Sequence, residues 1–161
     1  MRRLVLFIRQ TEASMTPTSQ GVVFQELTAP AVSPASRTSL TQAVQKYFDL
    51  MYDCDTSHLL EVFRSTAHLH GFRDGQMMSW SMETYKNVLD KRQSPKSLGA
   101  ARADEILQMD FASADMAFVK ARVQIATMEF VDYLTWHCID GKWLITSKGF
   151  YLMSDGDPGK R

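Results

Sequence analysis

Asp132 lies in a stretch whose alternate positions are mostly apolar or aromatic, and the other carboxylate of this stretch, Asp140, belongs to a predicted turn. The stretch covers residues 130–150 and reads FVDYLTWHCIDGKWLITSKGF. A carboxylate that lines an apolar pocket can exchange a proton with a bound molecule, which makes Asp132 a candidate general acid or base. The alternative is a structural carboxylate that accepts hydrogen bonds from a nearby helix or loop. The sequence leaves both roles open.

Two histidines, His68 and His70, are two positions apart, and on a strand this spacing puts both on one face. We predict that His70 faces the same interior as Asp132 and acts as its hydrogen-bonding helper. Two imidazoles would also suit zinc or iron if a third ligand completed the set. No third ligand has a suggestive spacing, so no metal site is predicted. A register slip of one residue would turn His70 outward.

Apolar and aromatic residues near Asp132 are predicted to line a ligand pocket. The predicted lining consists of Leu134, Trp136, Trp143 and Ile145, together with Tyr47 from the first helix and Lys148. The two tryptophans would stack on a flat ligand, although paired aromatics on a sheet also suit ordinary core packing. Lys148 reaches this pocket only if a β-bulge near residues 147–149 shifts the strand register, which Gly149 makes possible.

The elements that position these residues begin with a hairpin. Asp140-Gly141 separates two runs rich in β-branched and aromatic residues, which predicts a two-residue turn. The pairs that follow from this turn are Ile139–Lys142, Cys138–Trp143, Trp136–Ile145, Leu134–Ser147 and Asp132–Gly149. Strand alternation then puts Asp132 on the apolar face and Lys148 on the opposite face.

Helical spacing of apolar residues predicts three helices before and between the strands. The first is capped by Thr38 or Ser39 and buries Leu40, Val44, Tyr47, Phe48 and Met51. The second covers residues 56–63 after Asp55, and the third runs from Ser81 to about Lys91. Trp80 and Tyr85 occupy the two positions of a hydrophobic staple around the start of the third helix.

Besides the two strands of the hairpin, alternating segments predict four strands, at residues 67–73, 76–80, 105–111 and 116–127. Together the elements indicate an α+β fold in which three N-terminal helices pack on a curved antiparallel sheet. Ala117 and Ala121 make the apolar face of the 116–127 strand shallow, so we expect a cavity there.

The chain of 161 residues supports one domain, predicted at residues 38–152. Residues 10–37 are rich in Thr, Ser, Pro, Ala and Gln, so residues 1–37 are expected to form a flexible extension, and residues 153–161 are expected to form a disordered tail. Acidic and basic residues balance at 18 each, which argues against nucleic acid or an anionic membrane as partner. No apolar run is long enough to span a bilayer. Two cysteines without metal-type spacing favour a cytoplasmic location.

Sequence motifs for covalent or cofactor chemistry are missing. Phosphate-binding glycine loops, the serine nucleophile elbow and zinc-protease patterns do not occur. We therefore predict no cofactor, and any catalysis would be acid–base chemistry.

Three segments together resemble the nuclear transport factor 2-like superfamily, a cystatin-like α+β cone. They are YFDLMYDCDTSHLLEVF, HLHGFRDGQMMSWSMETY and the stretch FVDYLTWHCIDGKWLITSKGF, and the resemblance covers residues 39–150. Within this superfamily, the chain resembles a bacterial branch described as "putative lumazine-binding" or SnoaL-like. The resemblance implies a pocket between the helices and the concave sheet face. Enzymes of this superfamily commonly use a buried carboxylate, but many members only bind ligands, so the fold does not decide the activity.

Three functions remain open on this basis. The first is a binder of a small hydrophobic or aromatic molecule. The second is a cofactor-independent isomerase, cyclase or dehydratase with Asp132 as acid or base. The third is a dimerisation module without a pocket. A homodimer is expected in any case, because the outer sheet face carries Phe118, Tyr133 and Leu144 among its polar residues.

Overall fold

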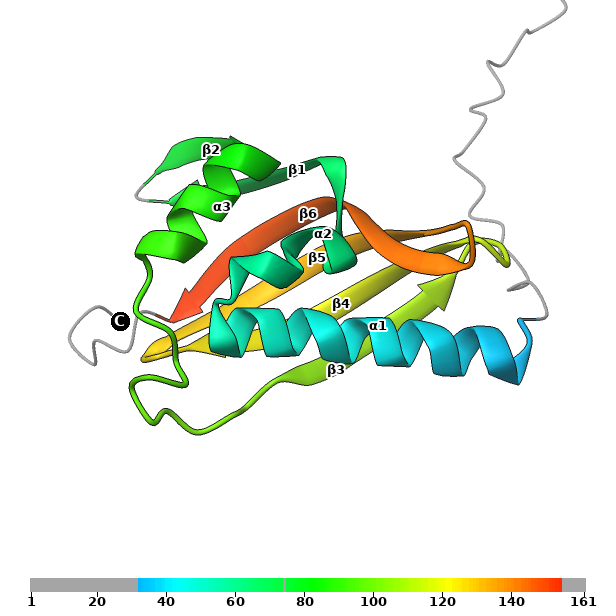
Figure 1. The fold of residues 1–161 in the computed structure, drawn as a ribbon, viewed down its shortest axis with the longest axis horizontal. Coiled ribbons are helices and arrows are strands. Elements are labelled where there is room, and N and C mark those ends of the chain that lie inside the picture. Colours follow the sequence, from blue (N-terminus) through cyan, green and yellow to red (C-terminus); the bar gives the residue numbers. More distant parts are fainter. Residues whose placement is uncertain (1–31, 74, 155–161) are drawn as a thin grey trace, which may run out of the picture.

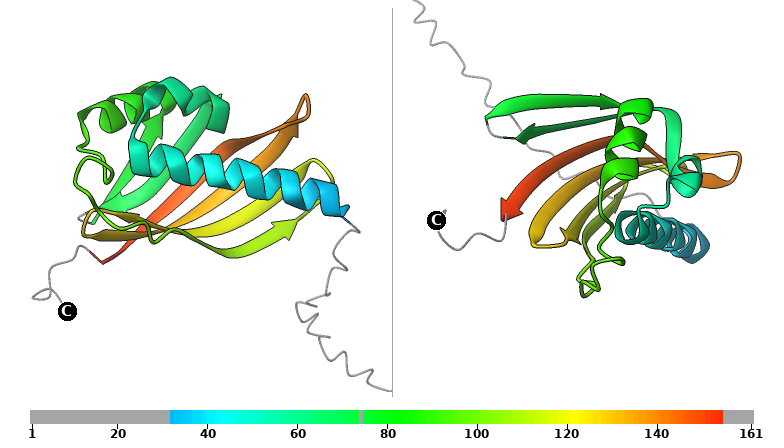
Figure 2. Two further views of the ribbon diagram at one scale, coloured as in Figure 1. Left: turned by 60° about the horizontal axis from the view of Figure 1, so that its bottom comes forward. Right: turned by 60° about the vertical axis from the view of Figure 1, so that its left-hand side comes forward.

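The computed structural model describes residues 32–73 and 75–154. The predicted tail beyond Ser154 and most of the predicted N-terminal extension lie outside these residues. The described part contains helices and a six-stranded sheet, with the helices on one face of the sheet (Figures 1 and 2). Within these residues no helix is both long and apolar enough to cross a membrane.

Helix α1, Pro34–Asp53, begins four residues or more before the predicted caps. Ser33 caps it, with its Oγ accepting a hydrogen bond from the Ser36 amide at 3.1 Å, and Pro34 occupies the first helical position. Serine followed by proline is a favourable helix start. An amide at the first helical position would have no partner within the helix, so the missing N–H group of proline costs nothing there. The prediction of Thr38 or Ser39 as the cap was wrong. The first turn of the helix is exposed, so the buried apolar residues that indicated a helix begin about one turn after its true start.

The short helices follow the sequence signals closely. Asp55 caps the 3-10 turn η1, Thr56–His58, which continues into α2, Leu59–Val62. Ser81 caps α3, Met82–Lys91, as predicted. The rings of Trp80 and Tyr85 stack at 6.2 Å, which confirms the contact between the two staple positions.

The sheet is mixed, with strand order β2-β1-β6-β5-β4-β3. The strands are β1 Phe63–Arg73, β2 Gln76–Ser81, β3 Glu105–Phe111, β4 Met116–Ile125, β5 Met128–Ile139 and β6 Lys142–Ser154. Strand β1 pairs with β6 in parallel, and the other neighbours are antiparallel. The expected all-antiparallel sheet is therefore wrong at this one pair. Helices α1 and α2 precede the sheet and α3 follows β2, which is the predicted order.

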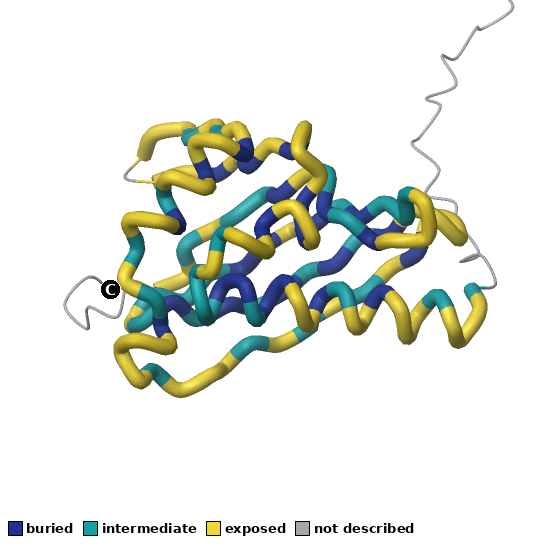
Figure 3. Tube along the Cα trace, in the orientation of Figure 1, coloured by how far each residue is buried: buried dark blue, intermediate teal, exposed yellow. Residues whose placement is uncertain are grey.

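Burial follows the predicted alternation on β4 and the predicted stripe on α1 (Figure 3). The inward residues of β4 are Ala117, Val119, Ala121, Val123 and Ile125, and those of α1 include Leu40, Val44, Tyr47, Phe48 and Met51. Ala117 and Ala121 are fully buried, so the shallow part of the sheet is filled instead of hollow.

The β5–β6 hairpin departs from simple alternation near Thr135, and its register shifts again at the far end, between Glu129 and Phe130. The predicted pairs are confirmed from Ile139–Lys142 to Trp136–Ile145, but Thr135 then pairs with Ser147. Thr146 is the additional residue of a β-bulge, which shifts the pairs from Thr135–Ser147 to Phe130–Leu152 by one. Leu134 therefore lies opposite Lys148 instead of Ser147, and Asp132 lies opposite Phe150 instead of Gly149. This shift brings Lys148 to the inner face.

Gly71 on β1 provides a test of the close packing between β1 and β6. A Cβ atom at Gly71 would lie 2.5 Å from the ring of Phe150, so Gly71→Ala must displace that ring. We expect Gly71→Ala to lower the free energy of unfolding by about 1–3 kcal/mol, as overpacking does. Urea denaturation followed by circular dichroism measures this change.

Gly149→Ala is the matched control, because its Cβ would lie at an ordinary 3.6 Å from Tyr133. The control is expected to be neutral or slightly stabilising. Equal effects of the two substitutions would contradict the close packing at Gly71.

Candidate functional site

Three polar side chains meet beneath α1 and form what we call the buried triad: Tyr47, Asp132 and Lys148. The Lys148 Nζ atom lies 3.0 Å from Asp132 Oδ2 and donates to Tyr47 Oη at 2.7 Å. The Tyr47 hydroxyl in turn donates to Asp132 Oδ2 at 2.5 Å. Asp132 is 1% exposed and Lys148 6% exposed, so this ion pair is nearly removed from water.

Each member of the triad comes from a different element. Asp132 lies on β5, where strand alternation turns it inward as predicted. Lys148 lies on β6 and faces inward because of the bulge at Thr146. Tyr47 lies on the buried stripe of α1. The three contacts therefore bind α1 to two neighbouring strands.

The protonation of Tyr47 follows from its surroundings. Burial raises the pKa of the Tyr47 phenol well above its ordinary value, and the neighbouring Asp132 carboxylate raises this pKa further. Tyr47 consequently keeps its proton and donates a hydrogen bond to Asp132. The second carboxylate oxygen, Asp132 Oδ1, is buried and accepts no hydrogen bond within the described part of the chain.

A cavity of about 350 Å³ lies beside the triad, between α3 and the inner sheet face. Its lining consists of Leu69, Phe72, Arg73, Trp80, Tyr85, Val88, Arg92, Ile125, Met128, Phe130, Lys148, Phe150 and Leu152. Lys148 is the member of the triad that belongs to this lining. Most of the cavity lining is therefore aromatic or apolar, and its charged residues are Arg73, Arg92 and Lys148.

The predicted lining of Leu134, Trp136, Trp143, Ile145 and Tyr47 is not that of the cavity. These residues are buried under α1, and Trp136 is fully buried. Trp143 donates from Nε1 to Ser39 Oγ at 3.1 Å, and its ring packs edge-on against Phe111. Trp136 and Trp143 are therefore core residues and do not line the cavity, because α1 covers this half of the sheet.

His70 does not meet Asp132. It is exposed on the outer face of β1, where its ring stacks on that of His68 at 6.3 Å. The inward positions of this strand are Ala67, Leu69 and Gly71. His70 is therefore removed from the candidate site. The alternation of these small and apolar residues with His68 and His70 along the strand would have predicted that both histidines face outward.

Sequence reasoning missed the residues that shape the cavity from α3 and the ends of β2 and β6. Trp80 stacks on Phe150 at 5.5 Å as well as on Tyr85, so its role exceeds that of a staple. Arg92, which ends α3, also lines the cavity. A basic residue directly after an amphipathic helix was the available signal, although such residues commonly serve as helix caps.

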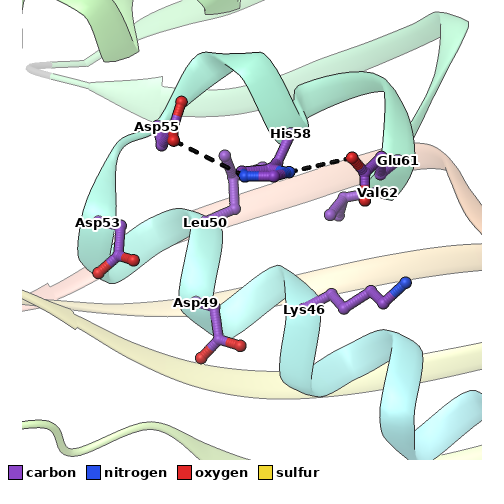
Figure 4. Close-up of a pocket in the computed structure, with 8 residues that line it drawn as sticks. All are labelled: Lys46, Asp49, Leu50, Asp53, Asp55, His58, Glu61 and Val62. Atoms are coloured by element: carbon purple, nitrogen blue, oxygen red, sulfur yellow. Dashed lines mark hydrogen bonds and ion pairs between the residues drawn. The ribbon is translucent and has the colours of Figure 1, made fainter.

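A second, smaller cleft of about 230 Å³ lies between α1 and η1 and is rich in carboxylates (Figure 4). His58 lies between Asp55 and Glu61, and the hydrogen bond and charge of Glu61 raise the pKa of His58. Asp49 and Asp53 pair with Arg102 and Lys96 outside the cleft. In residues 32–73 and 75–154, no three His, Cys, Asp or Glu side chains form a metal-type cluster. The cleft is best explained as helix capping and surface ion pairs.

Comparison with known proteins identifies the fold. Residues 35–151 match the family described as "Putative lumazine-binding". No curated protein matches the chain.

Solved structures share the architecture at low sequence identity. An NTF-2-like protein of unknown function from Silicibacter pomeroyi is 22% identical with a TM-score of 0.63, over 73% of this chain and 96% of that chain. An NTF2-like protein of unknown function from Shewanella baltica is 18% identical with a TM-score of 0.67, over 74% and 95%. A ketosteroid isomerase-like protein from Erwinia carotovora atroseptica is 13% identical with a TM-score of 0.59, over 76% and 99%. These likenesses establish an NTF2-like fold.

The buried triad yields a prediction about stability. Lys148→Met leaves the Asp132 charge buried without its partner, so we expect it to lower the free energy of unfolding by about 3–5 kcal/mol. Lys148→Met combined with Asp132→Asn removes both charges and should restore most of this loss. Urea denaturation measures all three proteins.

The control for this prediction is Lys86→Met, which removes an exposed ion pair with Asp90 at 2.8 Å. An exposed pair of this kind contributes roughly 0.3–0.5 kcal/mol, so the control should barely change stability. A Lys148→Met effect as small as that of Lys86→Met would show that the triad is not a buried charge network.

Proposed function

Since the chain belongs to the family described as "Putative lumazine-binding", we propose that it binds a small aromatic or hydrophobic molecule in the cavity between α3 and the sheet. The observation that carries this proposal is the lining, in which aromatic rings surround a space edged by Lys148. The volume of about 350 Å³ is at the small end of the roughly 300–1,000 Å³ range of ligand sites. A molecule of one or two rings suits this space.

The aromatic side chains of the cavity support a flat ligand. Trp80 stacks on both Tyr85 and Phe150, with ring planes inclined by 16° and 24°. Trp80 is only half-buried, so part of its surface borders the space. Offset stacking on such rings contributes about 0.5–1.5 kcal/mol beyond the area that a ligand buries.

Binding without turnover is better supported than acid–base catalysis. A general base must come within hydrogen-bonding reach of the proton that it removes. Asp132 does not belong to the cavity lining, and its Oδ2 atom already accepts from Tyr47 and Lys148. An isomerase, cyclase or dehydratase using Asp132 would need the triad to open. A pure dimerisation module would leave the cavity without a role.

Val88 on α3 offers a test of the cavity, because it lines the space from the helix side. We expect two-dimensional NMR with a library of one- and two-ring compounds to show shifts at cavity residues of the unmodified protein. Val88→Trp fills the space with an indole ring and should abolish these shifts.

Leu60→Trp adds the same ring at a position that is 61% exposed on α2, and it should retain all binding. A library without a single hit at the cavity residues would contradict the proposed function. Conversion of a bound compound into a product would favour the catalytic alternative.

We also propose a homodimer through the outer sheet face. Tyr133 on β5 is 44% exposed and its ring lies 5.7 Å from that of Phe118 on β4. Lys120 lies over the Tyr133 ring at 5.3 Å, and Leu144 on β6 is half-buried. An aromatic group with an adjacent cation is typical of interface centres.

Multi-angle light scattering is expected to give twice the mass of the chain. Tyr133→Glu places a charge at the proposed centre of contact and should give a monomer, since an unpaired buried charge is costly. Leu98→Glu, at a position 48% exposed in the loop after α3, is the control and should remain dimeric. A monomeric unmodified protein would refute the proposed dimer.

A further inference from the structure

Arg92 is the charged group of the cavity whose hydrogen bonding is incomplete. It follows the last turn of α3, where its amide donates to the Leu89 carbonyl at 3.1 Å. The residue is half-buried, and its Nη1 atom is buried without a hydrogen-bond partner in the part of the chain that the structure describes. A guanidinium N–H group that loses water without gaining an acceptor is unfavourable.

The charges around the cavity are all of one sign. The charged residues of the lining are Arg73, Arg92 and Lys148, and no carboxylate belongs to it. Asp132 balances Lys148 at 3.0 Å. Among the described residues no carboxylate lies within ion-pair distance of Arg92. Arg92 is therefore a lining cation for which residues 32–73 and 75–154 supply no carboxylate partner.

The ammonium group of Lys148 has one N–H bond that the described contacts do not use. An ammonium group has three N–H bonds, and the described contacts use two of them, to Asp132 and to Tyr47. Lys148 also lines the cavity, so a molecule inside that reaches its Nζ atom would find one N–H bond that these two contacts do not use. Two donors of positive charge thus border the same small space.

We propose that the cavity selects aromatic molecules that carry a carboxylate, with Arg92 as the group that recognises the anion and Lys148 as a second donor. This inference rests on the proposed function and specifies its ligand class. A carboxylate is planar and matches the guanidinium fork, so it satisfies the unpaired N–H group of Arg92. A phosphate monoester would bring nearly two charges to a site where Asp132 already neutralises Lys148. The ring of the ligand would lie against Trp80 and Phe150.

A purely structural role is the competing explanation for Arg92. Burial raises the pKa of the Cys54 thiol, and the Arg92 charge together with a side-chain hydrogen bond from Arg92 opposes this rise. Cys54 ends α1, so the Arg92 charge also lies near the carboxyl-terminal end of that helix. A structural role predicts a loss of stability when Arg92 is replaced, without any change in the choice of ligand.

The experiment compares two probes of equal shape, naphthoate and its uncharged analogue naphthamide, by isothermal titration calorimetry. We expect the unmodified protein to bind naphthoate about tenfold to a hundredfold more tightly, since a charged hydrogen bond contributes roughly 1.5–3 kcal/mol. Arg92→Gln should remove this preference while naphthamide binds as before. Arg64→Gln, an exposed arginine outside the cavity, should keep it.

The comparison on the unmodified protein stands even if Arg92→Gln fails to fold. Equal binding of the two probes would overturn the selection of anions and leave the proposed binding function intact. Failure of both probes to bind would overturn the inference and the proposed function together. Loss of both probes in Arg92→Gln, with lower stability, would assign Arg92 a structural role and overturn its role in recognition.

Discussion

An ion pair buried beneath α1 constrains the arrangement of the inner sheet face. Asp132 and Lys148 come from neighbouring strands, and Tyr47 joins them from α1. An uncompensated charge at this depth is strongly destabilising, so the three side chains have to meet in the folded protein. This requirement sets the register of β6 against β5 and the rotation of α1 about its own axis. It also separates the inner face into a packed half under α1 and a hollow half under α3.

The ion pair depends in turn on one additional residue in β6. Without Thr146 as a bulge, strict alternation would turn Lys148 to the outer face and leave Asp132 without its cation. The bulge is supported locally, because His137 Nδ1 lies 2.7 Å from Thr146 Oγ1. A polar side chain on β5 thus helps to fix the orientation of a lysine two residues further along β6.

The sequence predicted those features that depend on neighbouring residues. Asp140-Gly141 gave the turn, Ser81 and Asp55 gave helix caps, and alternation gave the inward position of Asp132. Features that depend on distant segments were missed. The parallel pairing of β1 with β6 joins residues that are about 80 positions apart, and no local pattern encodes it. A bulge requires no particular residue type, so the sequence left the face on which Lys148 lies undecided. The cavity expected beside Ala117 and Ala121 does not form, because α1 packs there.

Stability alone does not account for the buried ion pair, because well-packed apolar residues of similar volume are often as stable or more so. The position of the ion pair beside the cavity suggests a second role, which apolar residues in its place could not fill. Lys148 stands where the packed half of the inner face meets the cavity, and two of its donors are held by Asp132 and Tyr47. These contacts restrict the ammonium group to one orientation, which lowers the entropy that a ligand would lose on contacting it. A fixed donor at the edge of an aromatic space orients a bound molecule, whereas the rings around it provide most of the buried area.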